Sequence, residues 1–416
     1  MQHYSHRSLK QRCTLQFLSA VLAICAAGTS VAQVVTLSPV ITGITGTAER
    51  MISYRHQEHS WQTSDGGIHL LVNRGTVPTG DSLVLYSSYD AGATWTPVIT
   101  LPDSDAVSTG DGTLVTVNGT ANLLVVYGTS QATQNIMYKT LTYNSAARTW
   151  TVASTQTVFT SPAVAASNPA LGIDSAGIYW AVYTAQDRAT LLNQEQLSYR
   201  AMPSKTWTST PVVFGGTDNS LQHSARPIAY RNGIAMIYED GQTLYWAYRL
   251  TGWAVTAPWV SFAIGTGLPA PSQNPYGSHF SAVADGAGNI HLAYVANQQL
   301  VYRRYLSSTD TWGATRPMTP STIQAAYVQA VLAGSNVMLM VNYMQSIEVL
   351  QSTDAGNTFA FTQALVHARP PTGSTLSYNN PRIEAPSHAT SPVPTWQQYV
   401  DGTTQGLMFF QVPTLP

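Results

Sequence analysis

An eight-residue pattern that occurs twice places the strongest constraint on how this chain folds. Residues 88–95 read Ser-Tyr-Asp-Ala-Gly-Ala-Thr-Trp, and residues 352–359 read Ser-Thr-Asp-Ala-Gly-Asn-Thr-Phe. Ser and Asp side chains form hydrogen bonds with nearby backbone in turns, and Gly adopts a positive φ without steric cost. The pattern therefore predicts a tight β-hairpin, in which Thr begins the second strand and the aromatic ring packs behind the turn.

The rest of the chain repeats a unit of short strands. Residues 167–182, 223–238 and 279–294 align with one another, and each reads as a strand, a Gly-containing turn and a second strand; residues 59–70 form a shorter copy. Each unit continues to a third strand and a fourth, and the fourth often begins with a Thr-aromatic pair, at Thr94-Trp95, Thr149-Trp150, Thr206-Trp207, Thr311-Trp312 and Thr358-Phe359. A period of roughly 50 residues is within the range of propeller blades.

These units predict an all-β protein with one domain, a β-propeller of four-stranded antiparallel blades. Seven blades fit residues 50–101, 102–160, 161–215, 220–263, 275–318, 323–366 and 376–414. The last unit has three clear strands, and residues 34–41 supply the fourth, which closes the ring and removes an exposed sheet edge. Six blades are the alternative if the first or last unit is mostly insertion.

The eight-residue pattern resembles the Asp-box of the sialidase-like (BNR-repeat) β-propellers. In that family the Asp-box joins the third and fourth strands of a blade, on the outside of the propeller and away from the ligand site. The resemblance therefore implies a fold and a structural role for the pattern, and it leaves the chemistry open.

The first 32 residues are predicted to be a secretory signal peptide. Arg7, Lys10 and Arg12 precede the short apolar run 15–28, and Ser30-Val31-Ala32 offers small residues for cleavage. The propeller domain then spans residues 33–416 of a secreted or periplasmic protein. Both cysteines, Cys13 and Cys25, lie within the signal peptide, so no disulfide is expected after cleavage.

Charge and composition narrow the classes of partner. Cleavage leaves 16 Lys and Arg against 20 Asp and Glu, a formal charge of −4, and charged residues make up only 9% of the chain. Nucleic acid requires a basic stripe, which this chain lacks. No apolar run after residue 33 is long enough to span a membrane. We expect a monomer that binds carbohydrate, with no cofactor and no metal site, because the chain lacks the characteristic ligand patterns.

Candidate site residues follow from position in the repeat, since propeller ligands bind where the innermost strands begin. The positions that carry His, Arg, Tyr or amide side chains are Arg55, His56, His59, Asn168, His223, Arg226, Tyr276, His279, Tyr327, Gln329, Asn380 and Arg382. Arg binds carboxylates or sulfates in a bidentate manner, and His serves as an acid or base near neutral pH. An acidic glycan is therefore the expected ligand. His69 and His291 occupy matching Ile-His-Leu strands and are expected to be structural.

Three functions remain open at this point. Sialidase-like hydrolysis is one, and Arg55, Arg226 and Arg382 could form the family's arginine triad, although the first unit lacks its Arg-Ile-Pro motif. The stretch from His279 to Tyr294 is similar to repeats of seven-bladed polysaccharide lyases such as ulvan lyases. That resemblance implies His223 or His279 as the base, Tyr276 as the acid and Arg226 as the carboxylate clamp. A carbohydrate-binding propeller without catalysis is the third.

Overall fold

The computed structural model consists of β-strands and connecting turns in the part of the chain that it describes. This part comprises residues 39–52, 56–76, 81–201, 205–218, 223–269, 280–318, 327–343, 346–366, 376–377, 382–401 and 403–416. The predicted signal peptide lies outside it and stays a prediction. No helix among these residues is long and apolar enough to cross a membrane.

The described strands pair into seven sheets, which we number in chain order. Sheet 1 contains β2 (Ser60–Gln62), β3 (Ile68–Asn73), β4 (Leu83–Ser88) and β5 (Thr96–Leu101). Sheet 2 contains β6 (Gly110–Val117), β7 (Thr120–Gly128), β8 (Ile136–Asn144) and β9 (Thr149–Phe159). Sheet 3 contains β10 (Val164–Ile173), β11 (Tyr179–Asp187), β12 (Asn193–Arg200) and β13 (Trp207–Asp218). Sheet 4 contains β14 (Ala225–Tyr230), β15 (Gly233–Asp240), β16 (Thr243–Leu250) and β17 (Val260–Thr266).

The remaining three sheets include short or divided strands. Sheet 5 contains β18 (Phe280–Ala284), β19 (Ile290–Ala296), β20 (Gln299–Leu306), β21 (Thr311–Trp312) and β22 (Arg316–Pro317). Sheet 6 contains β23 (Tyr327–Ala333), β24 (Asn336–Tyr343), β25 (Ser346–Ser352) and β26 (Ala360–Val366), and β29 (His388–Ala389) pairs with β23 in parallel. Sheet 7 contains β27 (Leu376–Ser377), β28 (Ile383–Glu384), β30 (Val393–Asp401), β31 (Thr404–Val412) and β1 (Val40–Gly46).

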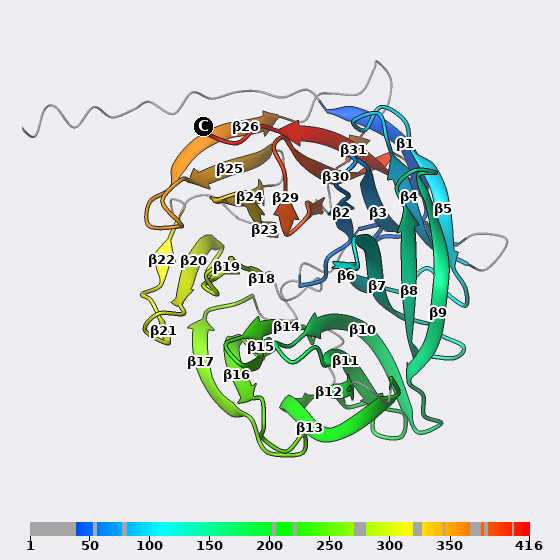
Figure 1. Ribbon diagram of the computed structural model, residues 1–416, viewed down its shortest axis with the longest axis vertical. Coiled ribbons are helices and arrows are strands. Elements are labelled where there is room, and N and C mark those ends of the chain that lie inside the picture. The colour runs from blue at the N-terminus through cyan, green and yellow to red at the C-terminus, as the bar shows by residue number, and fades with distance from the viewer. Residues whose placement is uncertain are drawn as a thin grey trace, which may run out of the picture.

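The sheets stand around a central axis as a β-propeller, with one edge strand of each near the centre; in sheet 6 this edge is β29 (Figure 1). Apart from the β23–β29 pair, neighbouring strands in the described sheets are antiparallel, as predicted. Each predicted repeat unit coincides with one sheet. Sheets 3 and 4 extend to Asp218 and Thr266, a few residues beyond the predicted ends of their units, because β13 and β17 continue along the outer edge.

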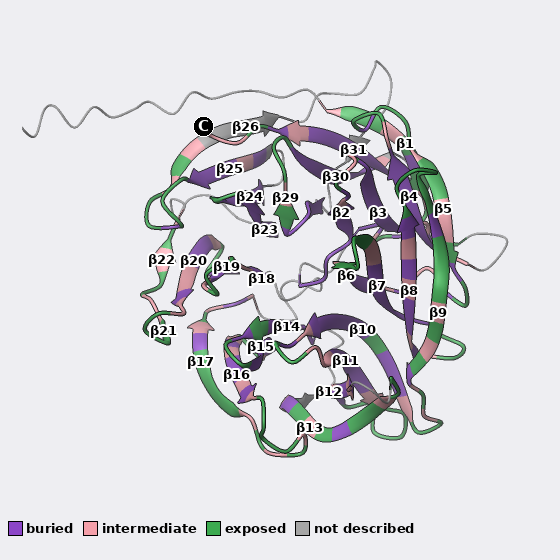
Figure 2. Cartoon of the chain, viewed as in Figure 1, coloured by how far each residue is buried: buried purple, intermediate pink, exposed green. Residues whose placement is uncertain are grey.

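Packing between sheets explains why the middle strands are apolar on both faces. Ile290, Leu292 and Tyr294 of β19 belong to a hydrophobic cluster shared with sheet 4, whereas Ala293 and Val295 belong to one shared with sheet 6. The described core consists of seven such clusters, each between two successive sheets. Because alternate residues face opposite sides, both sets are buried (Figure 2).

The ring closes by pairing of the two ends of the chain. β1 pairs antiparallel with β31, and one hydrophobic cluster joins sheet 7 to sheet 1. An N-terminal strand was predicted in this role, but at residues 34–41. The structure places β1 at Val40–Gly46, where Ile44 is buried against sheet 1, and residues 34–38 lie outside the described residues.

Both eight-residue patterns form the predicted turns between the third and fourth strands of a sheet. In the first, Asp90 accepts from the Thr94 amide at 2.9 Å and from its hydroxyl at 2.6 Å, and Ser88 accepts from the Gly92 amide at 2.9 Å. Asp354 makes the equivalent bonds with Thr358 at 2.8 and 2.7 Å. The Trp95 and Phe359 rings pack against the preceding sheet, on Phe409 and Tyr302 respectively.

Candidate functional site

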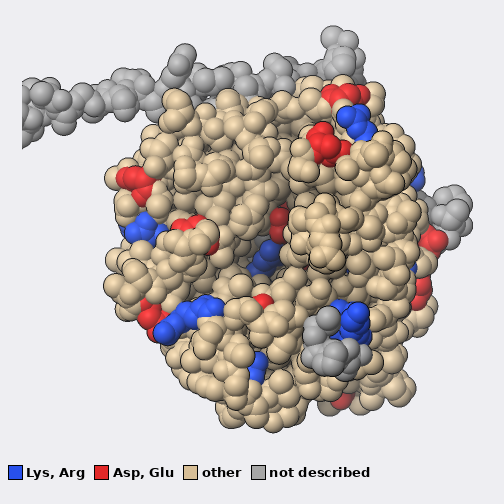
Figure 3. All heavy atoms as spheres, viewed as in Figure 1, with Lys and Arg blue, Asp and Glu red and all other residues tan. Residues whose placement is uncertain are grey.

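A cavity of about 380 Å³ lies at the centre of the ring. Figure 3 shows this hollow with acidic and basic atoms at its base. Its walls come from the innermost strands of sheets 1 to 5 and from the segment that follows β28. Most of the wall is apolar, and the lining residues are Glu58, Trp61, Gln62, Thr113, Leu114, Leu171, Gly172, Ile173, Arg226, Pro227, Ile228, Ala229, Ala282, Val283, Ala284, Ser387 and His388.

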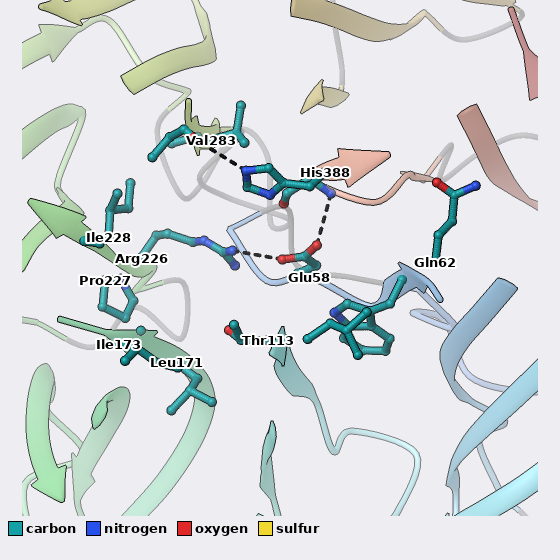
Figure 4. A pocket seen from close by; sticks show the side chains of 17 residues that line it. Glu58, Gln62, Thr113, Leu171, Ile173, Arg226, Pro227, Ile228, Val283 and His388 are labelled. Carbon is teal, nitrogen blue, oxygen red and sulfur yellow. Dashed lines mark hydrogen bonds and ion pairs between the residues drawn. The ribbon is translucent and has the colours of Figure 1, made fainter. Parts of the chain in front are cut away.

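An ion cluster forms the polar part of this cavity (Figure 4). Arg226, the second residue of β14, donates from Nη1 to Asp111 Oδ1 at 3.0 Å and from Nη2 to Glu58 Oε2 at 3.3 Å. Asp111 of β6 is fully buried, whereas the Glu58 and Arg226 side chains are each 12% exposed. The two cavity-facing groups of the cluster are therefore one carboxyl and one guanidinium.

Burial changes the protonation of Glu58. It raises the pKa of this carboxyl from 4.5 to about 7; Arg226 opposes the shift, and the charge of Asp111 adds to it. The pKa of Asp111 is also raised by burial, against the favourable effects of Arg226 and of the Leu171 and Glu58 amides. Glu58 thus exchanges a proton near neutral pH, as a general acid or base must.

His388 supplies a second titratable group on the cavity wall. Its Nε2 lies 3.0 Å from the carbonyl oxygen of Ala284 and must donate to it, because a carbonyl only accepts. The neutral ring then carries its lone pair on Nδ1. Next to it, the Ser387 amide donates to Glu58 Oε1 at 3.1 Å, so the His388 segment and Glu58 are held together.

Arg226 is the member of the predicted site set that lines this cavity in the described part of the chain. His59 lies nearby, with Nδ1 3.4 Å from Glu384 Oε2. Asn168 adopts a φ of 51° and accepts from the Thr109 hydroxyl at 3.4 Å. The predicted entrance at the beginnings of the innermost strands thus holds buried, mutually bonded polar groups, while the cavity extends along the later residues of those strands.

Two further predicted residues, Tyr327 and Arg382, lie together between sheets 6 and 7. The Arg382 guanidinium stands over the Tyr327 ring, 5.4 Å from its centroid, and both side chains are buried. Gln329 of the same strand donates to the Ala385 carbonyl at 2.9 Å. This arrangement joins two sheets and is a stabilising cation–π contact.

His223 lies beside a buried carboxyl at the start of β14. The pKa of Glu195 is raised to about 7 by burial, and the charge of His223 opposes the shift. Thr184 donates to Glu195 at 3.3 Å and to the His223 carbonyl at 3.4 Å. The remaining predicted site residues, Arg55, Tyr276, His279 and Asn380, lie outside the described residues, so the arginine triad and the lyase assignment stay predictions.

The two histidines expected to be structural are structural. His69 Nδ1 lies 2.7 Å from Ser87 Oγ of the neighbouring strand, and His291 Nδ1 lies 2.7 Å from Tyr302 Oη. The first strand of the predicted unit 59–70 is β2, which begins at Ser60. Among the described residues, no group of three His, Cys, Asp or Glu is arranged to hold a metal.

Sequence reasoning missed Glu58, Asp111 and His388. Glu58 is adjacent to the predicted His59, and Asp111 lies between two glycines at the start of a strand, but neither position is distinctive by itself. Their significance depends on Arg226, which lies 168 and 115 positions away along the chain. The available signal was that charged residues are scarce in this chain. The few that lie beside an innermost strand are expected to be buried, and a buried charge must have a partner.

The fold defines the class of protein as a β-propeller. No protein-family model matches the sequence, and no curated protein matches it. Solved structures similar to this chain include an ulvan lyase of a polysaccharide lyase family, bound to -[GlcA(1-4)Rha3S]-. It is 11% identical over 90% of this chain and 96% of that one, with a TM-score of 0.56.

A triple arginine-to-alanine variant of AofleA from Arthrobotrys oligospora is also similar. It is 12% identical over 80% of this chain and 91% of that chain, with a TM-score of 0.50. At such identities the likeness concerns the fold. The two predicted resemblances, to sialidase-like propellers and to propeller polysaccharide lyases, are confirmed at the level of the fold.

Proposed function

We propose that this protein is a secreted, carbohydrate-active propeller that cleaves an acidic glycan in the central cavity. The observation that carries the proposal is the Glu58–Arg226 pair, which places a carboxyl that titrates near pH 7 beside a fixed positive charge in a mostly apolar cavity. Perturbed titratable groups in a concave pocket are typical of active sites. The similarity to a polysaccharide lyase with a bound uronic acid glycan supports the same class of ligand.

The charges of the cluster determine how an acidic sugar binds. Arg226 faces two carboxylates, so the cluster carries a net charge of −1 when all three groups are ionised. Protonation of Glu58 removes this excess, and Arg226 then attracts a sugar carboxylate. We therefore expect the protein to bind acidic sugars with Glu58 protonated, and to bind them more weakly as the pH rises above about 7.

Protonated Glu58 also supplies the acid that both candidate reactions need. Hydrolysis and β-elimination each require a proton on the oxygen that leaves the glycosidic bond. In elimination, Nδ1 of His388 takes the proton from the carbon next to the sugar carboxylate. A double bond forms from that carbon to its neighbour, the bond from the neighbour to the leaving oxygen breaks, and this oxygen takes the proton of Glu58. In hydrolysis, Glu58 protonates the leaving oxygen as its bond to the sugar carbon breaks, and water adds to that carbon and releases a proton, which restores the one that Glu58 gave up. The roles predicted for His223, His279 and Tyr276 stay predictions.

The blade number and the compartment belong to the same proposal. We take each of the seven described sheets as one blade, since seven hydrophobic clusters join them in succession. The predicted signal peptide directs the protein out of the cytoplasm, and polymeric glycans are encountered outside it. A monomer is expected, because the cavity and its charged groups come from one chain.

A screen of the purified protein against sialosides, ulvan, pectin, alginate and glycosaminoglycans tests this function. Reducing ends and the ultraviolet absorbance of unsaturated uronides are followed together. Reducing ends with the absorbance indicate a lyase, and reducing ends or free sialic acid without it indicate a hydrolase. Retention on a glycan array without either signal would replace the proposal with a binding function.

Variants of Glu58 then connect the activity to the cavity. Glu58→Gln keeps the shape of the side chain and cannot donate a proton, so we expect a loss of at least about a hundredfold in kcat. Glu49→Gln is the matched control, since Glu49 is exposed on the surface, and it is expected to retain activity. Full activity in Glu58→Gln would show that the chemistry takes place elsewhere.

A further inference from the structure

The segment that leads into β2 runs through the centre of the ring (Figure 1). Residues 56–59 of this segment and Ser60, the first residue of β2, contact the surrounding sheets. The His56 ring stacks on Phe280 of sheet 5 with centroids 6.1 Å apart, and the His56 carbonyl accepts from Arg226 of sheet 4 at 2.8 Å. Gln57 donates to the Pro169 carbonyl of sheet 3 at 2.7 Å. These contacts reach innermost strands on the far side of the channel from sheet 1.

The next three residues attach the segment to sheets 2 and 7. The Glu58 amide donates to Asp111 of sheet 2 at 2.5 Å. The His59 amide and the Ser60 hydroxyl both donate to Glu384 of sheet 7, at 3.3 and 3.2 Å. All five residues are buried. We call residues 56–60 the plug, because they fill the channel where the innermost strands begin.

The plug forms the floor of the cavity, and its Glu58 side chain is the group that faces the cavity. In the described part of the chain, the large cavity lies on one side of the plug, along the later residues of the innermost strands. The hollow beside His59 has a volume of about 10 Å³, which is too small for a sugar. At about 380 Å³ the cavity is near the lower limit of ordinary small-molecule sites. Its two cavity-facing ionic groups are at the closed end.

From this geometry we infer that the cavity binds the end of a glycan chain, with the terminal sugar unit against Glu58 and Arg226. The inference rests on the proposed function and specifies its substrate as chain ends. An internal unit must have chain leaving on both sides of the charged pair, and the plug occupies one of those paths. A terminal acidic unit needs only the open side, and its carboxylate reaches Arg226 while the chain extends outward.

The test measures binding by calorimetry, with acidic oligosaccharides of one repeating structure and increasing defined length, at a pH near 6. If only the terminal unit binds, the association constant per chain stays unchanged from the shortest oligosaccharide that binds to the longest. If internal units bind, that constant increases in proportion to chain length and overturns the inference. If no acidic glycan binds at any length, the proposed function itself is wrong, so the two failures are distinguishable.

Two Trp substitutions on one strand show whether this binding occurs in the cavity. Thr113 of β6 lines the cavity, and Thr113→Trp fills it, so we expect binding of the short oligosaccharides to be lost. Thr116→Trp introduces the same side chain at an exposed position of β6 away from the cavity lining, and it should bind as the unchanged protein does. Circular dichroism confirms folding of both variants. Unchanged binding by a folded Thr113→Trp variant overturns the inference.

Discussion

The Glu58 carboxyl shows at the scale of one residue how burial and charge compete. Its pKa is raised because removal from water disfavours the charged form by more than Arg226 favours it. Arg226 in turn donates to two carboxylates and to a backbone carbonyl. If it moved away, the two buried carboxylates would lose their positively charged partner. The proposed reactivity and the stability therefore depend on the same three side chains.

The raised pKa of Glu58 predicts how stability changes with pH. The folded protein keeps a proton that the unfolded chain loses, so this contribution is complete below pH 4.5 and is lost as the pH rises through about 7. A shift of this size corresponds to about 3 kcal/mol in the free energy of unfolding. Urea titrations at about pH 4 and about pH 8 measure this. Between the two pH values, the free energy of unfolding of the unchanged protein should fall by about 3 kcal/mol more than that of Glu58→Gln. A constant difference between the two proteins would contradict the raised pKa.

Removal of Arg226 should leave two buried carboxyls without a counter-charge. Arg226→Met is expected to lower the free energy of unfolding by about 3–5 kcal/mol at pH 7. The loss should be smaller at pH 5, because Glu58 and Asp111 then take up protons more readily. Arg188→Met is the control, since Arg188 is exposed and its guanidinium donates to the neutral Gln134 side chain. Equal effects of the two substitutions would show that the cluster contributes nothing.

At the scale of elements, the turns between third and fourth strands connect neighbouring sheets. Gly92 has a φ of 89°, and a Cβ at this position would overlap with the ring of Phe409 on β31. The glycine therefore serves two purposes, a left-handed turn and close approach of sheet 1 to sheet 7. Tyr302 approaches Gly356 in the same way at the second turn.

Two glycine substitutions separate these purposes. Gly241 of the β15–β16 turn has a φ of 62° and no atom within 4 Å of a built Cβ, so Gly241→Ala should cost only the conformational strain, about 1–2 kcal/mol. Gly92→Ala adds the overlap with Phe409, for a further loss of about 1–3 kcal/mol. Chemical denaturation measures both. If Gly92→Ala costs no more than Gly241→Ala, the contact between sheets is not tight.

At the scale of the whole molecule, the stability of a propeller depends on closure of its ring. Each sheet is buried on both faces by its neighbours, so loss of one interface exposes two apolar surfaces. β1 covers the edge of β31 and contributes Ile44 to the cluster between sheets 7 and 1. This single strand therefore completes both a sheet and the ring.

Deletion of β1 tests the importance of closure. A chain that begins at Thr47 should unfold at a markedly lower temperature than a chain that begins at Ser38 or Pro39, because β31 becomes an unpaired edge. It should also aggregate more readily, and light scattering during heating detects this. Equal melting temperatures would mean that the pairing of β1 with β31 adds nothing to the stability of the ring.

Much of the architecture was predictable because it depends on local patterns. The eight-residue turns, the Thr-aromatic pairs and the repeat units are short-range features, and they predicted the sheets nearly to their ends. The N-terminal strand was predicted at residues 34–41, whereas β1 spans Val40–Gly46, because burial of Ile44 against sheet 1 depends on contacts between distant parts of the chain. Of the predicted site residues, Arg226 lines the central cavity, whereas its partners Glu58 and Asp111 were not identified from the sequence.

The sequence by itself determined the fold of this protein, because turns and alternating strands depend on residues that are close together in the sequence. Only the tertiary structure decided which charges meet. Glu58 precedes sheet 1, Asp111 belongs to sheet 2 and Arg226 belongs to sheet 4, and their pairing depends on the path of residues 56–60 through the centre of the ring. Such contacts follow from the closing of the whole propeller, which brings distant residues into a space of low polarity where each charge requires a partner.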